Sequence, residues 1–294
     1  MEGIWTVIPT VFNNQIENIM DLNSMSQLIE RQIKVDVTGI VLLGTTSEVS
    51  TLSKDEQIAQ VKQLTEKYWN QVYIMIGVSG NNTAEINEMI NQIKHDCDYI
   101  MLTVPYYNKP NQEGLEEHFK YLANNNSDVK FVLYNVPVRT GVNLEIDTLV
   151  NILKDCPNII GIKEASGNIS QIQDTVDRTH ISVMCGDDNL FIPAMSVGCK
   201  GLISVASNIV PSTLVSIYNQ LIKEEYVNAR ISYSTIHNIC KTCFITSNPI
   251  PLKMILYKMS LITSDYVRLP LKVPTNIKIV ESIDKTVDYI MKNF

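Results

Sequence analysis

The stretch Ile159-Ile-Gly-Ile-Lys163-Glu-Ala-Ser166 is typical of a buried β-strand, except that it contains a lysine. The residues before Lys163 are isoleucine or glycine, as expected for a strand that is covered on both faces. Lysine is almost never fully buried unless it is paired or used in chemistry. A water-poor environment lowers the pKa of an amine, and the neutral amine is the nucleophile that forms a Schiff base with a ketone. Lys163 is therefore the first candidate catalytic residue.

Similar apolar runs, rich in Ile and Val, recur along the first 205 residues and are separated by segments with helical periodicity. One such segment is Lys54–Trp69, and Ser53 with Glu56 predicts a capping box at its start. Further helices are predicted at Thr83–Lys94, Glu113–Ala123 and Glu145–Leu153. The predicted strands are Ile4–Ile8, Gly39–Leu43, Val72–Val78, Tyr99–Val104, Lys130–Asn135, Ile159–Glu164, Ser182–Cys185 and Gly201–Val205.

Eight strands that alternate with helices predict an α/β fold of the (β/α)8 TIM-barrel type. An open doubly wound sheet is the main alternative, and it normally has a Gly-rich phosphate-binding turn after its first strand. The corresponding turn here, Pro9-Thr10-Val11-Phe12, lacks glycine, which favours the barrel. We expect a catalytic barrel domain over residues 1–224 and a small C-terminal helical region over residues 225–294. The helices predicted in that region are Glu225–Thr242, Ile250–Met259 and Ile277–Met291.

The composition is that of a globular protein with a large core, with 45% hydrophobic and 19% charged residues. The formal net charge is −7, and no block of Lys or Arg occurs, so we expect neither nucleic acid nor a membrane surface as a partner. The first residues lack the features of a signal peptide, and no apolar run is long enough to span a bilayer. These features predict a cytoplasmic protein.

The cysteines and histidines do not form a pattern typical of a metal site. Six cysteines are scattered along the chain and are expected to be reduced core residues. Cys240 and Cys243 have the spacing of a zinc or redox pair, but no second pair accompanies them. The histidines lack ligand spacing, and each is predicted to lie on a solvated helix face, at positions His95, His118, His180 and His237. We therefore expect no metal.

Polar residues follow several of the predicted strands, at the barrel end where active sites lie. The second strand leads into Gly44-Thr-Thr-Ser-Glu48, and the fourth into Pro105-Tyr-Tyr-Asn108. The fifth ends in Tyr134 and is followed by Arg139, and the seventh leads into Gly186-Asp-Asp188. Hydroxyl groups, phenols, a guanidinium group and the amine of Lys163 are thus expected at one end of the barrel.

Each residue type has a use in Schiff-base chemistry. Backbone N–H groups and hydroxyls at Thr45 and Thr46 can hold a small carboxylate. A phenol near Lys163 can transfer protons, and Arg139 can bind a second carboxylate through two parallel hydrogen bonds. Taken singly, the threonines are usual turn formers, the tyrosines are usual packed residues and an arginine is most often at the surface. The combination is more specific than any one member.

These motifs resemble the dihydrodipicolinate synthase (4-hydroxy-tetrahydrodipicolinate synthase) family of N-acetylneuraminate lyase-like, pyruvate-dependent aldolases. The resemblance covers essentially the whole chain, including the C-terminal helices. It is carried by Gly44-Thr-Thr-Ser-Glu48, Tyr106-Tyr107, Tyr134-Asn-Val-Pro137, Arg139, Gly161-Ile-Lys-Glu-Ala165 and Gly186-Asp187. It implies a lyase that condenses pyruvate with L-aspartate-4-semialdehyde to 4-hydroxy-tetrahydrodipicolinate, an early step of diaminopimelate and lysine biosynthesis, without a cofactor.

The resemblance also implies roles for individual residues. Lys163 is similar to the family lysine that forms an imine with pyruvate, and Tyr134 to the phenol that relays protons to that centre. Thr45 resembles the hydroxyl that links Tyr134 to Tyr107, which in the family is contributed by a neighbouring subunit. Because a monomer would then lack a complete relay, the resemblance implies an oligomer, commonly a homotetramer that is a dimer of dimers.

The remaining matches concern substrate and effector binding. Thr46 resembles the residue that binds the pyruvate carboxylate, and Arg139 the residue that receives the semialdehyde carboxylate. Gly186 and Ile203 resemble positions that line the pocket. A lysine-feedback site at the subunit interface, present in many relatives, is matched by Asn81, Glu85 and Tyr106.

One departure concerns Ser47, which stands where family members usually have glycine. If that glycine serves a strained turn, a serine is expected to shift Thr45 and Thr46. Two alternatives stay open. A 2-keto-3-deoxy sugar-acid or N-acetylneuraminate aldolase would share the fold, although Arg139 favours the synthase. A non-catalytic regulatory barrel that binds pyruvate or lysine is supported only by Ser47.

Overall fold

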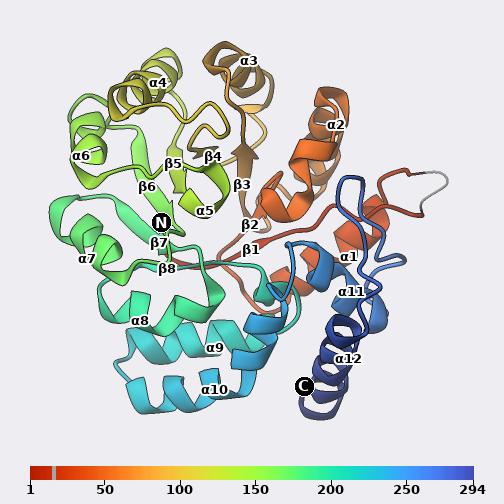
Figure 1. The fold of residues 1–294 in the computed structure, drawn as a ribbon. Coiled ribbons are helices and arrows are strands. Elements are labelled where there is room, and N and C mark those ends of the chain that lie inside the picture. The colour runs from red at the N-terminus through yellow and green to blue at the C-terminus, as the bar shows by residue number, and fades with distance from the viewer. Residues whose placement is uncertain (15–17) are drawn as a thin grey trace. The chain divides into compact units, whose positions relative to one another are not determined.

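A computed structural model describes residues 1–14 and 18–294, and the strands found there form a closed barrel. Their order around the barrel is their order in the chain, and the registered neighbours are parallel. The predicted (β/α)8 fold is therefore confirmed, and each predicted strand is present to within one residue at either end. The strands are β1 Gly3–Val7, β2 Gly39–Leu42, β3 Tyr73–Val78, β4 Tyr99–Thr103, β5 Phe131–Asn135, β6 Ile159–Glu164, β7 Ser182–Cys185 and β8 Gly201–Ser204 (Figure 1).

The helices begin and end close to the predicted residues. The predicted capping box is present at the start of α2, where the Glu56 N–H donates to the Ser53 hydroxyl at 3.2 Å and the Ser53 N–H donates to the Glu56 carboxylate at 2.8 Å. The helices are α1 Leu22–Ile33, α2 Lys54–Tyr68, α3 Thr83–Ile93, α4 Gln112–Asn125, α5 Pro137–Thr140, α6 Ile146–Asp155, α7 Ile169–Arg178, α8 Phe191–Ser196, α9 Pro211–Ile222, α10 Tyr226–Thr242, α11 Ile250–Lys258 and α12 Ile277–Asn293.

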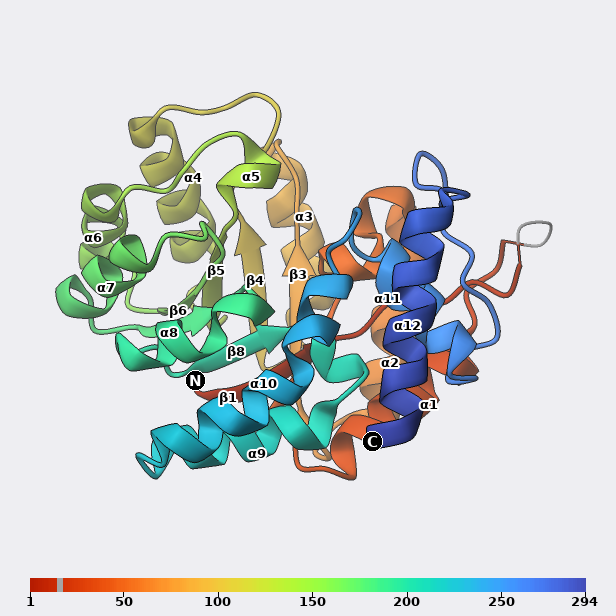
Figure 2. The ribbon, with the colours of Figure 1, turned by 60° about the horizontal axis from the view of Figure 1, so that its bottom comes forward.

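The chain forms two compact units. The first comprises residues 1–3 and 73–203 and contains β3 to β7, most of β8, and helices α3 to α8. Its strands are buried along most of their length, as the apolar runs predict. Helices α4 and α6 pack against each other (Figures 1 and 2).

The second unit comprises residues 4–72 and 204–294. It contains most of β1, all of β2, and helices α1, α2 and α9 to α12. Helix α9 lies beside α10, and α12 contacts both α10 and α11 (Figure 2). In β2, a side chain at Gly39 would overlap the buried indole of Trp5, so that glycine permits close packing of β1 on β2.

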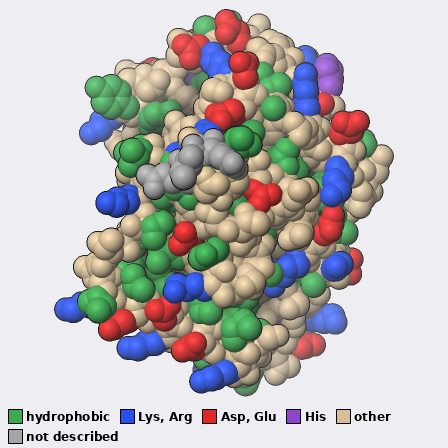
Figure 3. Space-filling model, turned by 90° about the vertical axis from the view of Figure 1, so that its right-hand side faces the viewer, with side chains coloured by type: hydrophobic (Ala, Val, Ile, Leu, Met, Phe, Trp, Pro, Cys, Tyr) green, Lys and Arg blue, Asp and Glu red, His purple; other side chains and the backbone are tan. Residues whose placement is uncertain are grey.

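The surface drawn in Figure 3 carries acidic and basic side chains interspersed with small groups of hydrophobic ones. Within residues 1–14 and 18–294, none of the helices has both the length and the apolar character that crossing a bilayer requires. Five of the cysteines are buried thiols, as predicted, and Cys97 is partly exposed.

The prediction of a solvated face was wrong for one histidine. His118 is only 7% exposed on the inner face of α4, and its Nδ1 pairs with the Thr83 hydroxyl at 2.8 Å. Burial lowers the pKa of His118 to about 4, because the imidazolium form would lose its hydration. His95, His180 and His237 are exposed, in agreement with the prediction.

His118 is expected to make the fold acid-sensitive. In the unfolded chain the imidazole has its ordinary pKa of 6.5, so the unfolded state binds a proton first as the pH falls towards the folded pKa of about 4. Stability is therefore full above pH 6.5 and declines below it, by up to about 3 kcal/mol from this group. Urea unfolding at a fixed protein concentration should show a flatter pH dependence for His118→Gln. Equal pH dependence in the wild type and the variant would contradict the assignment.

Candidate active site

Lys163 and Tyr134 are brought together on neighbouring strands of the first unit. β5 and β6 pair in parallel, with Tyr134 in register with Lys163. Each residue is only 6% exposed, and the Lys163 Nζ lies 4.4 Å from the centre of the Tyr134 ring. The buried lysine inferred from the sequence is thus present, and it has a phenol as its neighbour.

The turn after β7 leaves space for the lysine side chain. A Cβ atom at Gly186 would lie 3.0 Å from the Lys163 Cε and 2.7 Å from the Ala165 Cβ, so a larger residue would displace one of them. The Gly186 N–H donates to the Glu164 carbonyl at 2.8 Å, which fixes this turn against β6. The next residue, Asp187, is mostly buried. Burial raises the pKa of Asp187, and the charge of Lys163 acts in the opposite direction.

A polar network lies next to the Lys163–Tyr134 pair in the sheet. Asn135 is in register with Glu164, and its Nδ2 donates to both carboxylate oxygens at 3.2 and 3.0 Å. The Ser166 N–H and the Gln171 Nε2 also donate to Glu164, at 2.8 and 3.1 Å. Burial raises the pKa of Glu164, whereas these hydrogen bonds lower it.

The network fixes how the two strands align. Successive residues in a strand point to opposite faces, so Asn135 and Glu164 project away from the face that carries Tyr134 and Lys163. Hydrogen bonds on the opposite face of the sheet therefore hold β5 and β6 in the register that places Tyr134 beside Lys163. Glu164 and Asn135 were not among the predicted site residues, although a carboxylate inside an apolar strand carries the same signal as Lys163.

Three further predicted residues of the first unit lie in a loop, on a short helix and in a strand. Tyr107 is 87% exposed and has a φ of 72°, and Arg139 is exposed on the short helix α5. Ile203 is fully buried in β8.

The residues matched to a lysine-feedback site are partly linked. The Asn81 Nδ2 donates to the Tyr106 carbonyl at 3.2 Å, so these two predicted residues are brought together. Glu85 lies in the first turn of α3, where its carboxylate accepts a hydrogen bond from Asn82 at 3.1 Å.

In the second unit, the threonine motif forms a short 3-10 helix, η1 Thr45–Ser47, after β2. Thr46 is 2% exposed and Thr45 is half-buried. Ser47 belongs to this helix, and its hydroxyl donates to the Ile8 carbonyl at 2.7 Å. The left-handed conformation falls on Glu48, with a φ of 54°, and not on Ser47. The serine therefore fits the turn without the strain that the sequence comparison raised.

Glu48 forms a buried ion pair with Lys253 of α11. Both side chains are fully buried, and the Lys253 Nζ also donates to the Tyr266 carbonyl at 2.8 Å. The second carboxylate oxygen of Glu48 accepts the Arg268 N–H at 2.9 Å. Burial lowers the pKa of Lys253, and the charge of Glu48 acts in the opposite direction.

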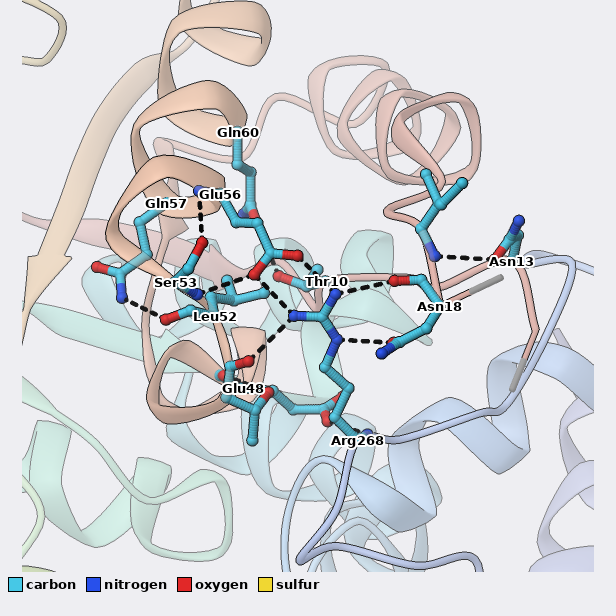
Figure 4. A network of polar contacts seen from close by, with 12 residues as sticks. Thr10, Asn13, Asn18, Glu48, Leu52, Ser53, Glu56, Gln57, Gln60 and Arg268 are labelled. Carbon is cyan, nitrogen blue, oxygen red and sulfur yellow. Dashed lines mark hydrogen bonds and ion pairs between the residues drawn. The ribbon is translucent and has the colours of Figure 1, made fainter. Parts of the chain in front are cut away.

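Arg268 extends these contacts to the segment that follows the threonine turn (Figure 4). Its guanidinium binds both carboxylate oxygens of Glu56, at 2.9 and 2.6 Å. It also donates to the Thr51 carbonyl at 3.0 Å and to two oxygens of Asn18, and it stacks 4.4 Å from the centre of the Phe12 ring. Through this bidentate pair, the guanidinium lowers the pKa of Glu56 to about 2.

A further contact reaches the threonine turn directly. The Asn248 Nδ2 donates to the Thr46 Oγ1 at 2.9 Å, and Asn248 is 6% exposed. Neither Asn248 nor Lys253 was among the residues predicted to belong to the site. Lys253 carried a usable signal, because it interrupts the otherwise apolar start of α11 just as Lys163 interrupts β6.

The fold and these residues define a (β/α)8 barrel with a buried strand lysine beside a tyrosine. The model of the Dihydrodipicolinate synthetase family matches residues 1–289, and the chain belongs to this family.

Individual relatives agree with this assignment. The chain is 37% identical to a 4-hydroxy-tetrahydrodipicolinate synthase of Campylobacter jejuni, over 99% of this chain and 98% of the relative. The structure of the corresponding synthase from Methylacidiphilum fumariolicum SolV has a TM-score of 0.95 at 33% identity, covering 99% of this chain and 96% of that one. The structure of a chloride-inhibited dihydrodipicolinate synthase from Acinetobacter baumannii, complexed with pyruvate, has a TM-score of 0.92 at 33% identity. The match covers 99% of both chains.

Removing only one partner of the buried ion pair is expected to destabilise the second unit strongly. Replacing Lys253 by Met leaves the Glu48 carboxylate buried without its cation, which should lower the free energy of unfolding by about 3–5 kcal/mol. Glu48→Gln combined with Lys253→Met removes both charges and should recover most of the loss.

Lys258→Met provides a matched control in the same helix. Lys258 pairs with Asp284 at the surface, so its loss should cost less than about 1 kcal/mol. Urea unfolding at one protein concentration measures all these variants. A Lys253→Met protein as stable as Lys258→Met would contradict the interpretation.

Proposed function

We propose that this chain is a Schiff-base-forming lyase that condenses pyruvate with L-aspartate-4-semialdehyde to give 4-hydroxy-tetrahydrodipicolinate. The observation that carries the proposal is the buried Lys163 Nζ at 4.4 Å from the ring centre of Tyr134. The family assignment and the printed names of the relatives support the same reaction. The reaction belongs to diaminopimelate and lysine biosynthesis. We propose a cytoplasmic location for the protein.

In the proposed mechanism, the neutral Lys163 amine attacks the keto carbon of pyruvate. The carbinolamine loses water to form an imine, and removal of a methyl proton gives an enamine. The enamine carbon attacks the aldehyde carbon of the semialdehyde, and the aldehyde oxygen takes up a proton to become the hydroxyl group. The amine of the second substrate then displaces Lys163 by transimination, which closes the ring and returns the lysine. One water leaves per turnover, so the atoms balance.

Proton transfer is assigned to a relay of Tyr134, Thr45 and Tyr107. Tyr134 is the phenol beside Lys163, and general acid–base groups of this kind contribute roughly 10²–10⁴-fold to rates. Thr46 is assigned to the pyruvate carboxylate and Arg139 to the semialdehyde carboxylate. Gly186 supports a role in the pocket, because the absence of its side chain leaves room for Lys163. Ile203 is assigned to the pocket lining on family resemblance.

The assembly is proposed to be a homotetramer built as a dimer of dimers, with residues 1–224 as the catalytic barrel and 225–294 as a helical region. The 87% exposure of Tyr107 supports a role in a neighbouring subunit. Asn81, Glu85 and Tyr106 are proposed to form a lysine-binding site. The hydrogen bond from Asn81 to Tyr106 supports that grouping.

The names of the relatives favour the synthase over a sugar-acid aldolase and over a non-catalytic regulatory barrel. A coupled assay that compares aspartate semialdehyde with 2-keto-3-deoxy sugar acids, with and without lysine, distinguishes the three.

Trapping with borohydride tests the covalent step. Reduction in the presence of pyruvate should attach the pyruvate carbon skeleton to one lysine, identified as Lys163 by peptide mass spectrometry. Lys163→Arg should show no adduct and almost no turnover, because a guanidinium does not form the imine. An adduct on another lysine, or none in the wild type, would exclude the mechanism.

Subunit complementation tests the position of Tyr107. Tyr107→Phe and Lys163→Ala proteins should each be weakly active, since each lacks one member of every site. The two variants are mixed in equal amounts, dissociated and reassembled. The mixture should regain roughly a quarter of wild-type activity, because random pairing combines an intact Lys163 with a partner's Tyr107 in about a quarter of the sites. No recovery, despite hybrid formation shown by native mass spectrometry, would place both residues in one subunit.

A further inference from the structure

The Thr46 hydroxyl is buried and already accepts one hydrogen bond. The Asn248 Nδ2 lies 2.9 Å from the Thr46 Oγ1, and the two residues are 6% and 2% exposed. An amide nitrogen can only donate, whereas a hydroxyl has one proton and two lone pairs. The bond from Asn248 therefore occupies a lone pair of Thr46 and leaves the hydroxyl proton available for another acceptor.

A carboxylate is such an acceptor, since it has no proton to donate. We propose that Asn248 is a positioning residue that keeps the Thr46 hydroxyl oriented as a donor to the carboxylate of pyruvate. This inference rests on the proposed function and adds a residue from the C-terminal part of the chain to it. Hydrogen bonds to a charged group are stronger than neutral ones, so the orientation of one hydroxyl affects affinity substantially.

The neighbouring contacts hold Asn248 in place independently of its own hydrogen bond. Asn248 lies just before α11, whose residues Ile250 to Leu256 are all buried. Lys253 of the same helix binds Glu48, which follows the threonine turn directly. Asn248 thus contacts the turn at Thr46 and Lys253 contacts Glu48, and the Arg268 backbone N–H adds a third contact through the Glu48 carboxylate. Changing the polar group at position 248 should therefore alter the hydrogen bond without moving the turn.

The other end of the Asn248 amide also indicates a functional role. Its Oδ1 is buried and has no hydrogen-bond partner among residues 1–14 and 18–294. A buried polar atom without a partner is costly and calls for an explanation. A residue needed only for packing would be better served by an apolar side chain, whereas a donor to Thr46 requires the amide nitrogen.

Asn248→Asp changes the polarity of this contact with almost no change in volume. The carboxylate can only accept, so the Thr46 hydroxyl should donate its hydrogen bond to this new carboxylate and direct an oxygen lone pair towards the pyruvate carboxylate. Borohydride trapping on Lys163 as a function of pyruvate concentration should show a half-saturating concentration increased about 10- to 100-fold. The trapping rate at saturation should change much less, because Lys163 and Tyr134 are untouched. Asn248→Ala, which leaves the hydroxyl unoriented, should show a smaller increase.

Thr46→Val provides the double-mutant test, because valine has no hydroxyl to orient. In that background, Asn248→Asp should produce little further increase in half-saturating pyruvate. An undiminished increase would mean that the new charge acts on pyruvate directly, which would overturn the proposal. Asn238→Asp, an exposed change on α10 with the same charge difference, should leave trapping unchanged.

Failure of this inference is distinguishable from failure of the proposed function. Wild-type protein that is not trapped by pyruvate would refute the function. Wild-type trapping with an unchanged half-saturating concentration in Asn248→Asp would refute only the role of Asn248. If the aspartate variant does not fold, Asn248→Ala decides the question: a severalfold increase supports the role, and an unchanged value overturns it.

Discussion

The burial of an amine on β6, in register with a phenol on β5, is the constraint on which the rest of the structure depends. Lys163 is only 6% exposed, and a lysine is almost never this buried unless it is paired or used in chemistry. The register that places Tyr134 beside it is fixed on the opposite face by Asn135 and Glu164. Gly186 leaves the space that the lysine side chain occupies.

In the second unit, buried polar contacts hold the threonine turn in place. A fully buried ion pair, three hydrogen bonds from the Arg268 guanidinium and an asparagine amide connect the C-terminal segment to residues 46–56. Figure 4 shows the contacts of Arg268, which also donates two hydrogen bonds to Asn18. Buried charges contribute little net stability when hydrophobic residues could replace them, so their presence here is better explained by a requirement for fixed geometry. We infer that the C-terminal segment holds the threonine turn in place, through Asn248 and Lys253.

Local patterns predicted much of this structure. Runs of Ile and Val predicted the strands, and Ser53 with Glu56 predicted the cap of α2. The apolar residues around Lys163 predicted a lysine buried within a strand. The prediction of a solvated face was wrong for His118, because helical periodicity does not reveal how far packing covers a polar position at the edge of the buried face. The contacts of Asn248 and Lys253 could not be predicted, because their partners lie 202 and 205 residues away and such contacts depend on tertiary structure. The conformation of Ser47 likewise required the turn itself, where Glu48 takes the left-handed position.

A crystal structure of the protein soaked in pyruvate tests the central claim most directly. The account predicts continuous electron density between the Lys163 Nζ and the second carbon of pyruvate, with the Tyr134 hydroxyl near the new bond. Well-ordered pyruvate at the barrel end beside an unmodified Lys163, or a Lys163 side chain directed to bulk solvent, would contradict it.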